Sequence, residues 1–383
     1  MKISISLASL LLLLFSLSCR EEENGSKIDL TYYDREPITD TVFAVTADAE
    51  TIPVDASISS DAADDPAIWV HPGDPSLSII YGSNKKGGIS AYDLSGDEIA
   101  FGEFGRINNI DIAYDLKLED EVIDICGGTN RSNNTLDLYR INPETGELTF
   151  ILEDPVESDV NVVYGFCFYH SPVSDKNYAF LCGKDGVIEQ YEIIEGGQYL
   201  ELQLADHFDI GSQPEGMVAD HKHGFLYIGE ENECIWKVNA EPNDNNPIKL
   251  DLSSESDNEN IEYDIEGLTI YYTSGDHGYL IASIQGNSTF AIYDRFYENK
   301  YIGSFSIILD IFDEVSESDG IDVMNLNLGD DFPSGIFIAQ DDRNRDAGKT
   351  KPQNFKMVKW EKIANIFDPP LMIDPYFNAR SLF

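Results

Sequence analysis

The chain has 383 residues, with 70 acidic and 25 basic side chains and a formal net charge of -45 at pH 7. This charge argues against nucleic acid as a partner, because nucleic-acid phosphates need a basic surface. The 20 Tyr and 20 Phe residues supply apolar surface for a large core, which argues against intrinsic disorder. An acidic folded chain of this kind is either very soluble or binds cations.

Residues 1–19 are predicted to be an export signal. Lys2 supplies a positive start, and Ile3 to Leu17 form an apolar segment too short to span a bilayer. Ser16-Leu17-Ser18-Cys19 resembles a bacterial lipobox, so we expect Cys19 to be lipidated. Ordinary signal-peptidase cleavage is the alternative, because Ser16 stands where Leu is usual.

Residues 20–40 lack an apolar period and are predicted to be a polar tether. Residues 41–383 are predicted to be the folded domain. The protein is therefore expected to be exported and anchored through lipid in the periplasm or at the cell surface, or otherwise secreted.

Short β-rich segments bounded by Gly, Asn, Asp and Pro fill the domain, which predicts an all-β fold. A polar residue opens a short strand, a hairpin with a polar turn follows, and this unit repeats at intervals of roughly 45 to 55 residues. Six copies predict a six-bladed β-propeller, with a solenoid of stacked hairpins as the rival. Thr41 to Ala47 is the candidate segment for closing the last blade. The six opening residues are Asp65, Asn109, Tyr164, Glu215, Glu266 and Asp319.

Radial repetition arranges equivalent residues of successive blades around one axis. The opening residues therefore predict one ring, and the hairpin turns predict a second ring that holds several of the chain's scarce cations. The sequence leaves open whether the two rings share a face. The turn residues are Lys85, Lys86, Arg131, Lys184, Glu230, Glu231, Gln285 and Asp341.

Clustered carboxylates need a counter-charge to stay ionised. Calcium suits them, because it takes about six to eight oxygen ligands, and magnesium and manganese are weaker candidates. A site that combines cations with Lys and Arg suits a phosphate group. Cys126 and Arg131 are one residue too close for a cysteine-phosphatase loop, so a metal-activated water is the simplest nucleophile.

The remaining cysteines and histidines point to no second chemistry. Cys167 and Cys182 lie on neighbouring predicted strands and either pair or remain buried thiols. The cysteines show no C-x-x-C spacing, which argues against zinc. His221 and His223 are expected in a surface turn.

The segment Asp61-Ala62-Ala63-Asp64-Asp65-Pro66-Ala67-Ile68-Trp69 is similar to the most specific signature of a known family. That family is the β-propeller phytases, which are calcium-dependent alkaline enzymes of the 3-phytase type. The match continues in order through Asn108 to Ile112, Val163 to Phe166, Glu215 to Met217, Asp264 to Tyr272, Gln285 to Ser288 and Ser318 to Val323. The resemblance covers about Ala49 to Ala364.

The resemblance implies six blades, several calcium ions, and adjacent phosphate sites for cleavage and for affinity. It implies a monomeric phosphoric monoester hydrolase that acts on phytate or calcium-phytate through metal-activated water attacking in line. The implied catalytic residues are Asp64, Glu215, Glu230, Asp264 and Glu266. Substrate would be bound by Lys85, Lys86, Arg131, Lys184 and Tyr164. Calcium would be held by Glu50, Asp64, Asp65, Tyr164, Glu215, Glu230, Asp264, Glu266 and Asp319, with Asp313 and Asp341 at stabilising ions.

The chain departs from the family pattern at four positions. Ala113 stands where Arg is usual, Asp185 and Val187 replace two Glu, and Arg343 stands where an acid is common. Two other functions are weighed against a phytase. A silent propeller lipoprotein could capture calcium-phytate for uptake, and a propeller lactonase or esterase could use one calcium, although the Lys and Arg ring would then lack a role.

Overall fold

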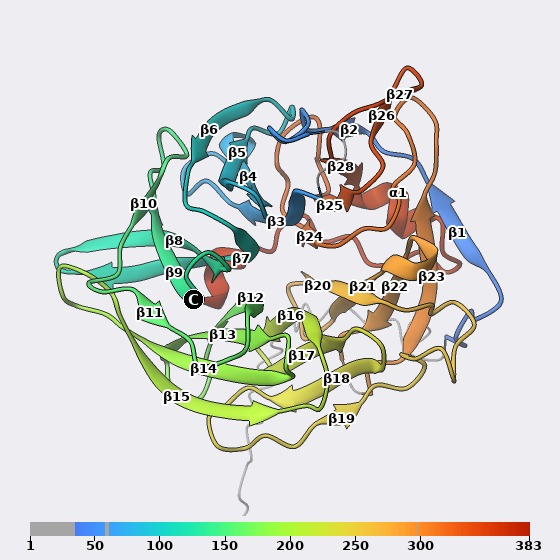
Figure 1. The fold of residues 1–383 in the computed structure, drawn as a ribbon. Coiled ribbons are helices and arrows are strands. Elements are labelled where there is room, and N and C mark those ends of the chain that lie inside the picture. The colour runs from blue at the N-terminus through green and yellow to red at the C-terminus, as the bar shows by residue number, and fades with distance from the viewer. Residues whose placement is uncertain (1–34, 58–60, 297) are drawn as a thin grey trace, which may run out of the picture. The chain divides into compact units, whose positions relative to one another are not determined.

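The computed structural model describes residues 35–57, 61–296 and 298–383. The predicted signal peptide, Cys19 and the first part of the predicted tether lie outside the described residues. Residues 36–383 form one unit, in which six sheets surround a common axis (Figure 1). The prediction of a six-bladed β-propeller is therefore confirmed. None of the described helices is long and apolar enough to cross a membrane.

Blades 1 to 3 use consecutive strands, ordered from the axis outward. Blade 1 comprises β3 (Ala63–Trp69), β4 (Ile79–Asn84), β5 (Gly88–Tyr92) and β6 (Glu98–Gly102). Blade 2 comprises β7 (Ile107–Leu118), β8 (Glu121–Asn130), β9 (Thr135–Ile141) and β10 (Leu148–Phe150), and β11 (Val156–Glu157) also pairs with β9. Blade 3 comprises β12 (Val163–His170), β13 (Asn177–Gly183), β14 (Val187–Ile194) and β15 (Glu201–Asp209).

The other three blades follow the same order. Blade 4 comprises β16 (Pro214–Asp220), β17 (Phe225–Glu230), β18 (Cys234–Asn239) and β19 (Ile248–Lys249). Blade 5 comprises β20 (Ile265–Tyr272), β21 (Gly278–Ile284), β22 (Thr289–Asp294) and β23 (Tyr301–Ile307). Blade 6 comprises β24 (Ile321–Met324), β25 (Ile336–Asp341) and β28 (Asn354–Lys359), with a small hairpin of β26 (Arg345–Asp346) and β27 (Lys349–Thr350) between the last two.

The N-terminal strands close the ring in a way that differs from the prediction. β1 (Val42–Val45) pairs in parallel with β23 as a fifth strand of blade 5, and β2 (Ala49–Glu50) pairs with β28 as the outer strand of blade 6. Thr41 to Ala47 therefore does not complete the last blade. β1 instead covers the otherwise open edge of β23, and an open edge is a site for unwanted pairing.

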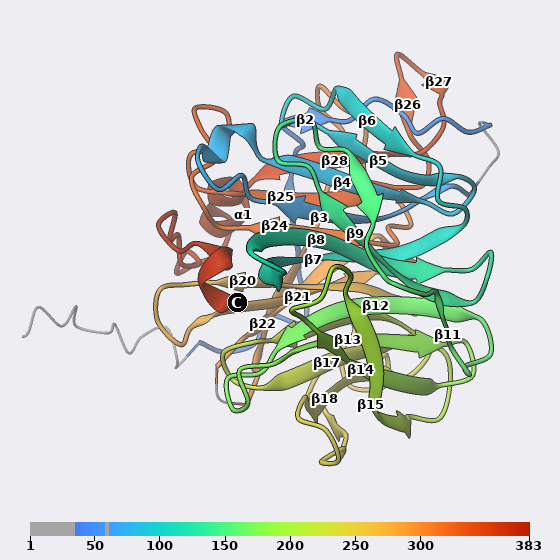
Figure 2. The same cartoon turned by 90° about the vertical axis from the view of Figure 1, so that its left-hand side faces the viewer.

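The helical segments are short. They are η2 (Pro75–Leu77), η3 (Gln285–Asn287), α1 (Trp360–Asn365) and η4 (Ala379–Leu382). Trp360 of α1 stacks on Tyr271 with ring centroids 4.0 Å apart. η4 and the C-terminal end lie near the inner strand β7 in both views (Figures 1 and 2), and the ring of Phe383 lies 5.7 Å from Tyr114 of that strand.

Antiparallel pairing places both predicted rings on one face. It sets the start of each innermost strand beside the end of the next strand, as in the pairs Ala63–Asn84 and Pro214–Glu230. The opening residues and the hairpin turns therefore meet at one mouth of the axis. Strand direction therefore places the two rings on the same face, a point that the sequence left open.

A β-bulge recurs where blades 1 to 5 begin. The pairing register shifts within the first residues of β3, β7, β12, β16 and β20, and a bulge of this kind re-aims side chains. In blades 3, 4 and 5 a glycine follows the residue whose side chain the bulge turns toward the mouth. A Cβ atom on Gly165 would lie 1.8 Å from the carbonyl oxygen of Glu215, and one on Gly216 would lie 2.0 Å from that of Glu266. These glycines let the inner strands approach closely at the mouth.

Candidate active site

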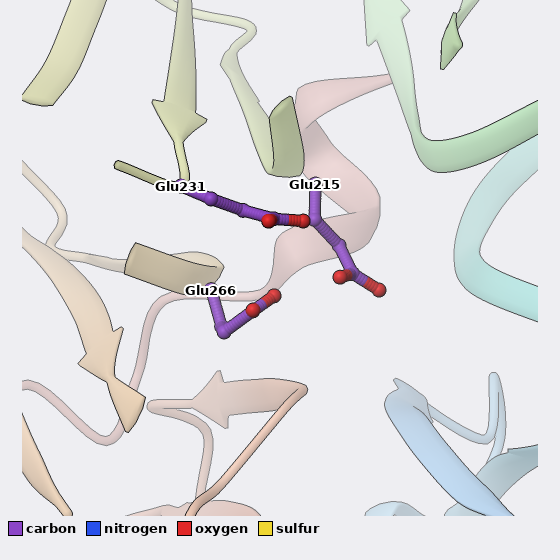
Figure 3. Close-up of side chains that lie close together, drawn as sticks. All are labelled: Glu215, Glu231 and Glu266. Atoms are coloured by element: carbon purple, nitrogen blue, oxygen red, sulfur yellow. The ribbon is translucent and has the colours of Figure 1, made fainter. Parts of the chain in front are cut away.

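Three glutamates of blades 4 and 5 converge at the mouth. Glu215 is the second residue of β16, Glu231 follows β17, and Glu266 is the second residue of β20. Each offers one carboxylate oxygen, and these oxygens lie within 4.8 Å of one another (Figure 3). All three residues are buried. The cavity that they share has a volume of about 320 Å³ and is lined by Asp61, Lys85, Tyr164, Gln213, Glu215, Glu231, Asp264, Glu266, Gln285, Glu317, Asp319 and Asp342.

Burial raises the pKa values of the cavity carboxyl groups. Burial, and then the charge of Glu215, raise the pKa of Glu266 well above its usual range. Burial raises the pKa of Glu231 to about 7, that of Asp319 to about 7, and that of Asp64 to about 6. A bound cation would reverse this, because an opposite charge favours the ionised carboxylate.

Lys85 is the cation nearest to these acids. Its Nζ atom lies 2.7 Å from Asp61 Oδ1, 3.0 Å from Asp64 Oδ1 and 2.7 Å from Asp319 Oδ2. Burial disfavours its charge, but these carboxylates outweigh burial and raise the pKa of the ammonium. Lys85 therefore stays charged in the cavity.

Tyr164 links the acids to two further cations. Its phenol donates a hydrogen bond to Glu215. Burial, and next the negative charge of Glu215, raise the pKa of Tyr164. Lys184 Nζ lies 3.7 Å from the centroid of the Tyr164 ring, and Arg131 Cζ lies 5.6 Å from it. Lys86 follows Lys85 and is exposed. The structure thus sets the predicted phosphate-binding residues of blades 1 to 3 around one side of the mouth.

Asn108 joins an acid to a cation, a role that the sequence did not reveal. It is fully buried, its Nδ2 donates to Glu215 Oε1 over 2.9 Å, and its Oδ1 accepts from Arg131 over 2.9 Å. An amide fits here because one side chain both donates and accepts. The repeat pattern singled out Asn109, but the bulge brings Asn108 to the mouth.

The donor set fits a hard cation. The ligand atoms are carboxylate, amide and phenol oxygens, which calcium prefers. Oδ2 of Asp64 and Oε2 of Glu266 are buried and accept no hydrogen bond. Buried oxygens without donors are costly, and a cation would satisfy them.

Two of the predicted ligands point elsewhere, and we correct both. Glu230 Oε1 accepts from the Ser212 hydroxyl over 2.6 Å and Oε2 from Trp236 Nε1 over 2.6 Å. Glu231 takes its place at the cavity. Asp65 Oδ2 accepts from the Ile110 amide over 3.0 Å, below the mouth. Successive residues of a strand face opposite sides, so a shift of one position changes the side-chain environment completely.

Glu50, Asp313 and Asp341 form a separate cluster in blade 6. They surround the fully buried Lys356, whose Nζ lies 2.6, 2.6 and 3.3 Å from their respective oxygens. Three carboxylates thus face one ammonium. Glu50 was predicted for the catalytic ions, but the structure groups it with the pair predicted for stabilising calcium.

Cys126, Cys167, Cys182 and Cys234 are free and buried, so the alternative of unpaired thiols is confirmed for the described residues. The expected turn is present at His221 to His223, where both histidines are half-buried. Burial lowers the pKa of His221 to about 3.

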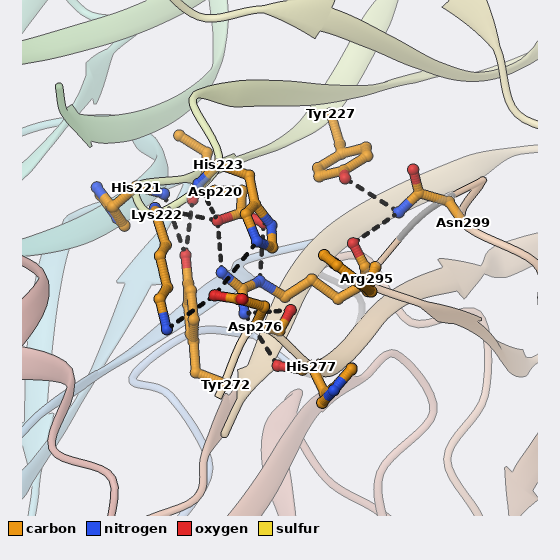
Figure 4. Close-up of polar contacts among 12 residues, drawn as sticks. Asp220, His221, Lys222, His223, Tyr227, Tyr272, Asp276, His277, Arg295 and Asn299 are labelled. Atoms are coloured by element: carbon orange, nitrogen blue, oxygen red, sulfur yellow. Dashed lines mark hydrogen bonds and ion pairs between the residues drawn. The ribbon is translucent and has the colours of Figure 1, made fainter. Parts of the chain in front are cut away.

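His223 adjoins a buried ion pair (Figure 4). The pair includes Asp220, which ends β16 and therefore lies on the face opposite the mouth. Its Nδ1 lies 2.9 Å from Asp220 Oδ2. The same aspartate binds Arg295 through two bonds of 2.7 Å. This pair ties blade 4 to blade 5.

Comparisons with known proteins agree with this geometry. The phytase family model matches residues 26–383. The 3-phytase of Bacillus subtilis (strain 168) is 45% identical over 346 residues, which cover 89% of this chain and 90% of that protein.

Solved structures give weaker likenesses. A protein from Lactobacillus plantarum has a TM-score of 0.45 at 13% identity and covers 78% of this chain and 88% of its own. The Cps50 (Swd1) β-propeller domain of Myceliophteria thermophila has a TM-score of 0.42 at 8% identity and covers 77% of this chain and 83% of its own. At these TM-scores neither likeness bears on function.

Proposed function

The chain belongs to the phytase family and is a phosphoric monoester hydrolase acting on phytate, and we propose that calcium ions at the mouth of the propeller drive this hydrolysis. The observation that carries the proposal is the buried trio of Glu215, Glu231 and Glu266, which offers carboxylate oxygens within 4.8 Å of one another. Phytate is myo-inositol hexakisphosphate, and each turnover releases one phosphate and a lower inositol phosphate.

The ions would be held by oxygen ligands on both sides of the cavity. When bound, calcium would neutralise the carboxylates, screen the phosphate charge and lower the pKa of the attacking water. The proposed ligands are Asp64, Tyr164, Glu215, Glu231, Asp264, Glu266 and Asp319.

The chain's own cations bind and orient the substrate. Lys85 is held among three carboxylates, so its ammonium stays charged and in place. Arg131 is fixed by Asn108 and the Tyr164 ring, where its guanidinium is positioned to bind two phosphate oxygens at once. Lys184 supplies a further charge above the same ring.

The blade 6 cluster supports a separate, stabilising role for calcium. Two negative charges remain there after Lys356 is counted against Glu50, Asp313 and Asp341. A divalent ion beside Lys356 would balance this charge.

We also propose that the enzyme is exported and anchored as a monomer through lipid on Cys19. The apolar start and the lipobox-like sequence support this proposal. Membrane contact would then occur only through the anchor. Labelling cells with a radioactive fatty acid tests it, because Cys19→Ser should abolish the label.

Phosphate release from phytate tests the catalytic proposal. Release should need calcium, stop in excess EDTA and fall strongly in Glu266→Gln. Glu121→Gln, which removes an exposed glutamate paired with Arg140, should behave as the wild type. Activity that persists in EDTA would contradict the calcium mechanism. Tight phytate binding without release would favour the capture function instead.

A further inference from the structure

The blade 6 hairpin turn carries a basic residue at the position that Lys86 occupies in blade 1. In blade 1 the Asn84 side chain ends the strand and accepts a hydrogen bond from the Lys86 amide over 2.9 Å. In blade 6 Asp341 ends the strand and accepts from the Arg343 amide over 3.3 Å. The two turns are therefore built alike, and Arg343 is the radial equivalent of Lys86.

Arg343 lies at the rim of the catalytic cavity. Its guanidinium pairs with Glu317, a residue of the cavity lining. The preceding residue, Asp342, also lines the cavity. The Arg343 side chain is 56% exposed, so a ligand in the solvent can reach it. Exposed pairs contribute little to stability, and this one is easily exchanged for a phosphate.

Blades 6 and 1 are neighbours at the mouth. The Gly320 amide of blade 6 donates to the carbonyl oxygen of Asp64 in blade 1 over 3.1 Å. Arg343 and Lys86 therefore extend from adjacent blades on the same face. Together they continue the arc of cations that Arg131 and Lys184 form on blades 2 and 3.

The other half of the mouth is acidic. The two positions after the hairpin strand are Glu231-Asn232 in blade 4, Gln285-Gly286 in blade 5 and Asp342-Arg343 in blade 6. Arg343 is the one basic residue among these six. A substrate with phosphates all around its ring would place some of them over this half.

We propose that Arg343 binds a phosphate of the substrate other than the one being cleaved, and so favours highly phosphorylated inositols. The proposal rests on the proposed function and deepens it. A guanidinium matches phosphate because it offers two parallel N–H donors.

Steady-state kinetics with two substrates tests the role. Phytate carries six phosphates, whereas p-nitrophenyl phosphate carries only the one that is cleaved. Arg343→Gln should raise KM for phytate about three- to fivefold with kcat unchanged, as expected for one exposed charged contact. KM for p-nitrophenyl phosphate should stay the same, and Arg343→Lys should recover part of the loss. Arg140→Gln is the matched control, because Arg140 is also an exposed arginine paired with a glutamate.

Binding of myo-inositol hexakissulfate gives a readout without turnover. Its Kd in calcium should rise in Arg343→Gln by the same factor as KM. Unchanged KM and Kd would overturn the proposal, and so would an equal rise in KM for both substrates, which would place Arg343 at the cleavage site. If the wild type released no phosphate but the hexakissulfate Kd still rose in Arg343→Gln, the proposed function would fall while the Arg343 contact stood.

Discussion

Glu230 and Glu231 are adjacent in sequence but are expected to fail in opposite ways when each is changed to glutamine. Glu231 is one of three carboxylates whose oxygens lie within 4.8 Å of one another. Its loss should weaken calcium affinity by ~10- to 100-fold or more. That range is typical when a residue that only hydrogen-bonds to a metal ligand is removed. It should not destabilise the calcium-free protein, because it removes repulsion.

Glu230→Gln should instead destabilise the fold and leave calcium affinity unchanged. Glu230 is 3% exposed and accepts from Ser212 and Trp236 over 2.6 Å each. A glutamine would turn an NH2 group toward one of these donors. Losing one charge-assisted bond of this kind costs about 1.5–3 kcal/mol of unfolding free energy.

Two measurements separate the pair. Calcium titration of phosphate release gives the half-saturating concentration, and urea unfolding in EDTA gives the free energy of unfolding. Each variant serves as the control for the other. The site assignment is refuted if Glu230→Gln shifts the calcium titration while Glu231→Gln does not.

Three further predictions concern stability and positioning. Arg295→Met should lower the free energy of unfolding by about 3 kcal/mol, because it strands a buried carboxylate, whereas exposed Lys176→Met should leave urea unfolding unchanged; equal effects would contradict this. The pKa values of the cavity carboxyl groups are raised, so above about pH 4 the native state binds more protons than the unfolded state. The free energy of unfolding in EDTA should therefore fall as the pH rises towards about 7. Thermal unfolding from pH 5 to 8 checks this: calcium should abolish the trend, and a rise in stability with pH would contradict it. Asn108→Leu should raise KM and lower calcium affinity together, because it releases both Arg131 and Glu215; a loss in only one quantity would argue against a shared anchor.

The fold was predictable because its repeat is regular. The six strand openings and six hairpins lie where polar residues bound the apolar segments of the sequence, from Asp65 to Asp319. Ring closure was not predictable in detail. Whether β1 or β2 completes blade 6 depends on which open edge lies nearby, and no local pattern in Thr41 to Ala47 contains that information.

The site was predictable to within one residue. The bulges of blades 1 to 5 insert a residue near the start of the inner strand. In blades 1 and 2 this brings Asp64 and Asn108 to the mouth, whereas the repeat pattern alone pointed to Asp65 and Asn109. The choice of Glu231 over Glu230 has a different cause, which is that side-chain direction alternates between neighbouring residues of a strand. A sequence with acids at both positions carries no signal that chooses between them.

The most direct test of the calcium site is anomalous X-ray diffraction from crystals grown with calcium and soaked with myo-inositol hexakissulfate. The account predicts strong anomalous peaks about 2.3–2.6 Å from the oxygens of Glu215, Glu231 and Glu266. An empty cavity in crystals that still hydrolyse phytate would contradict it.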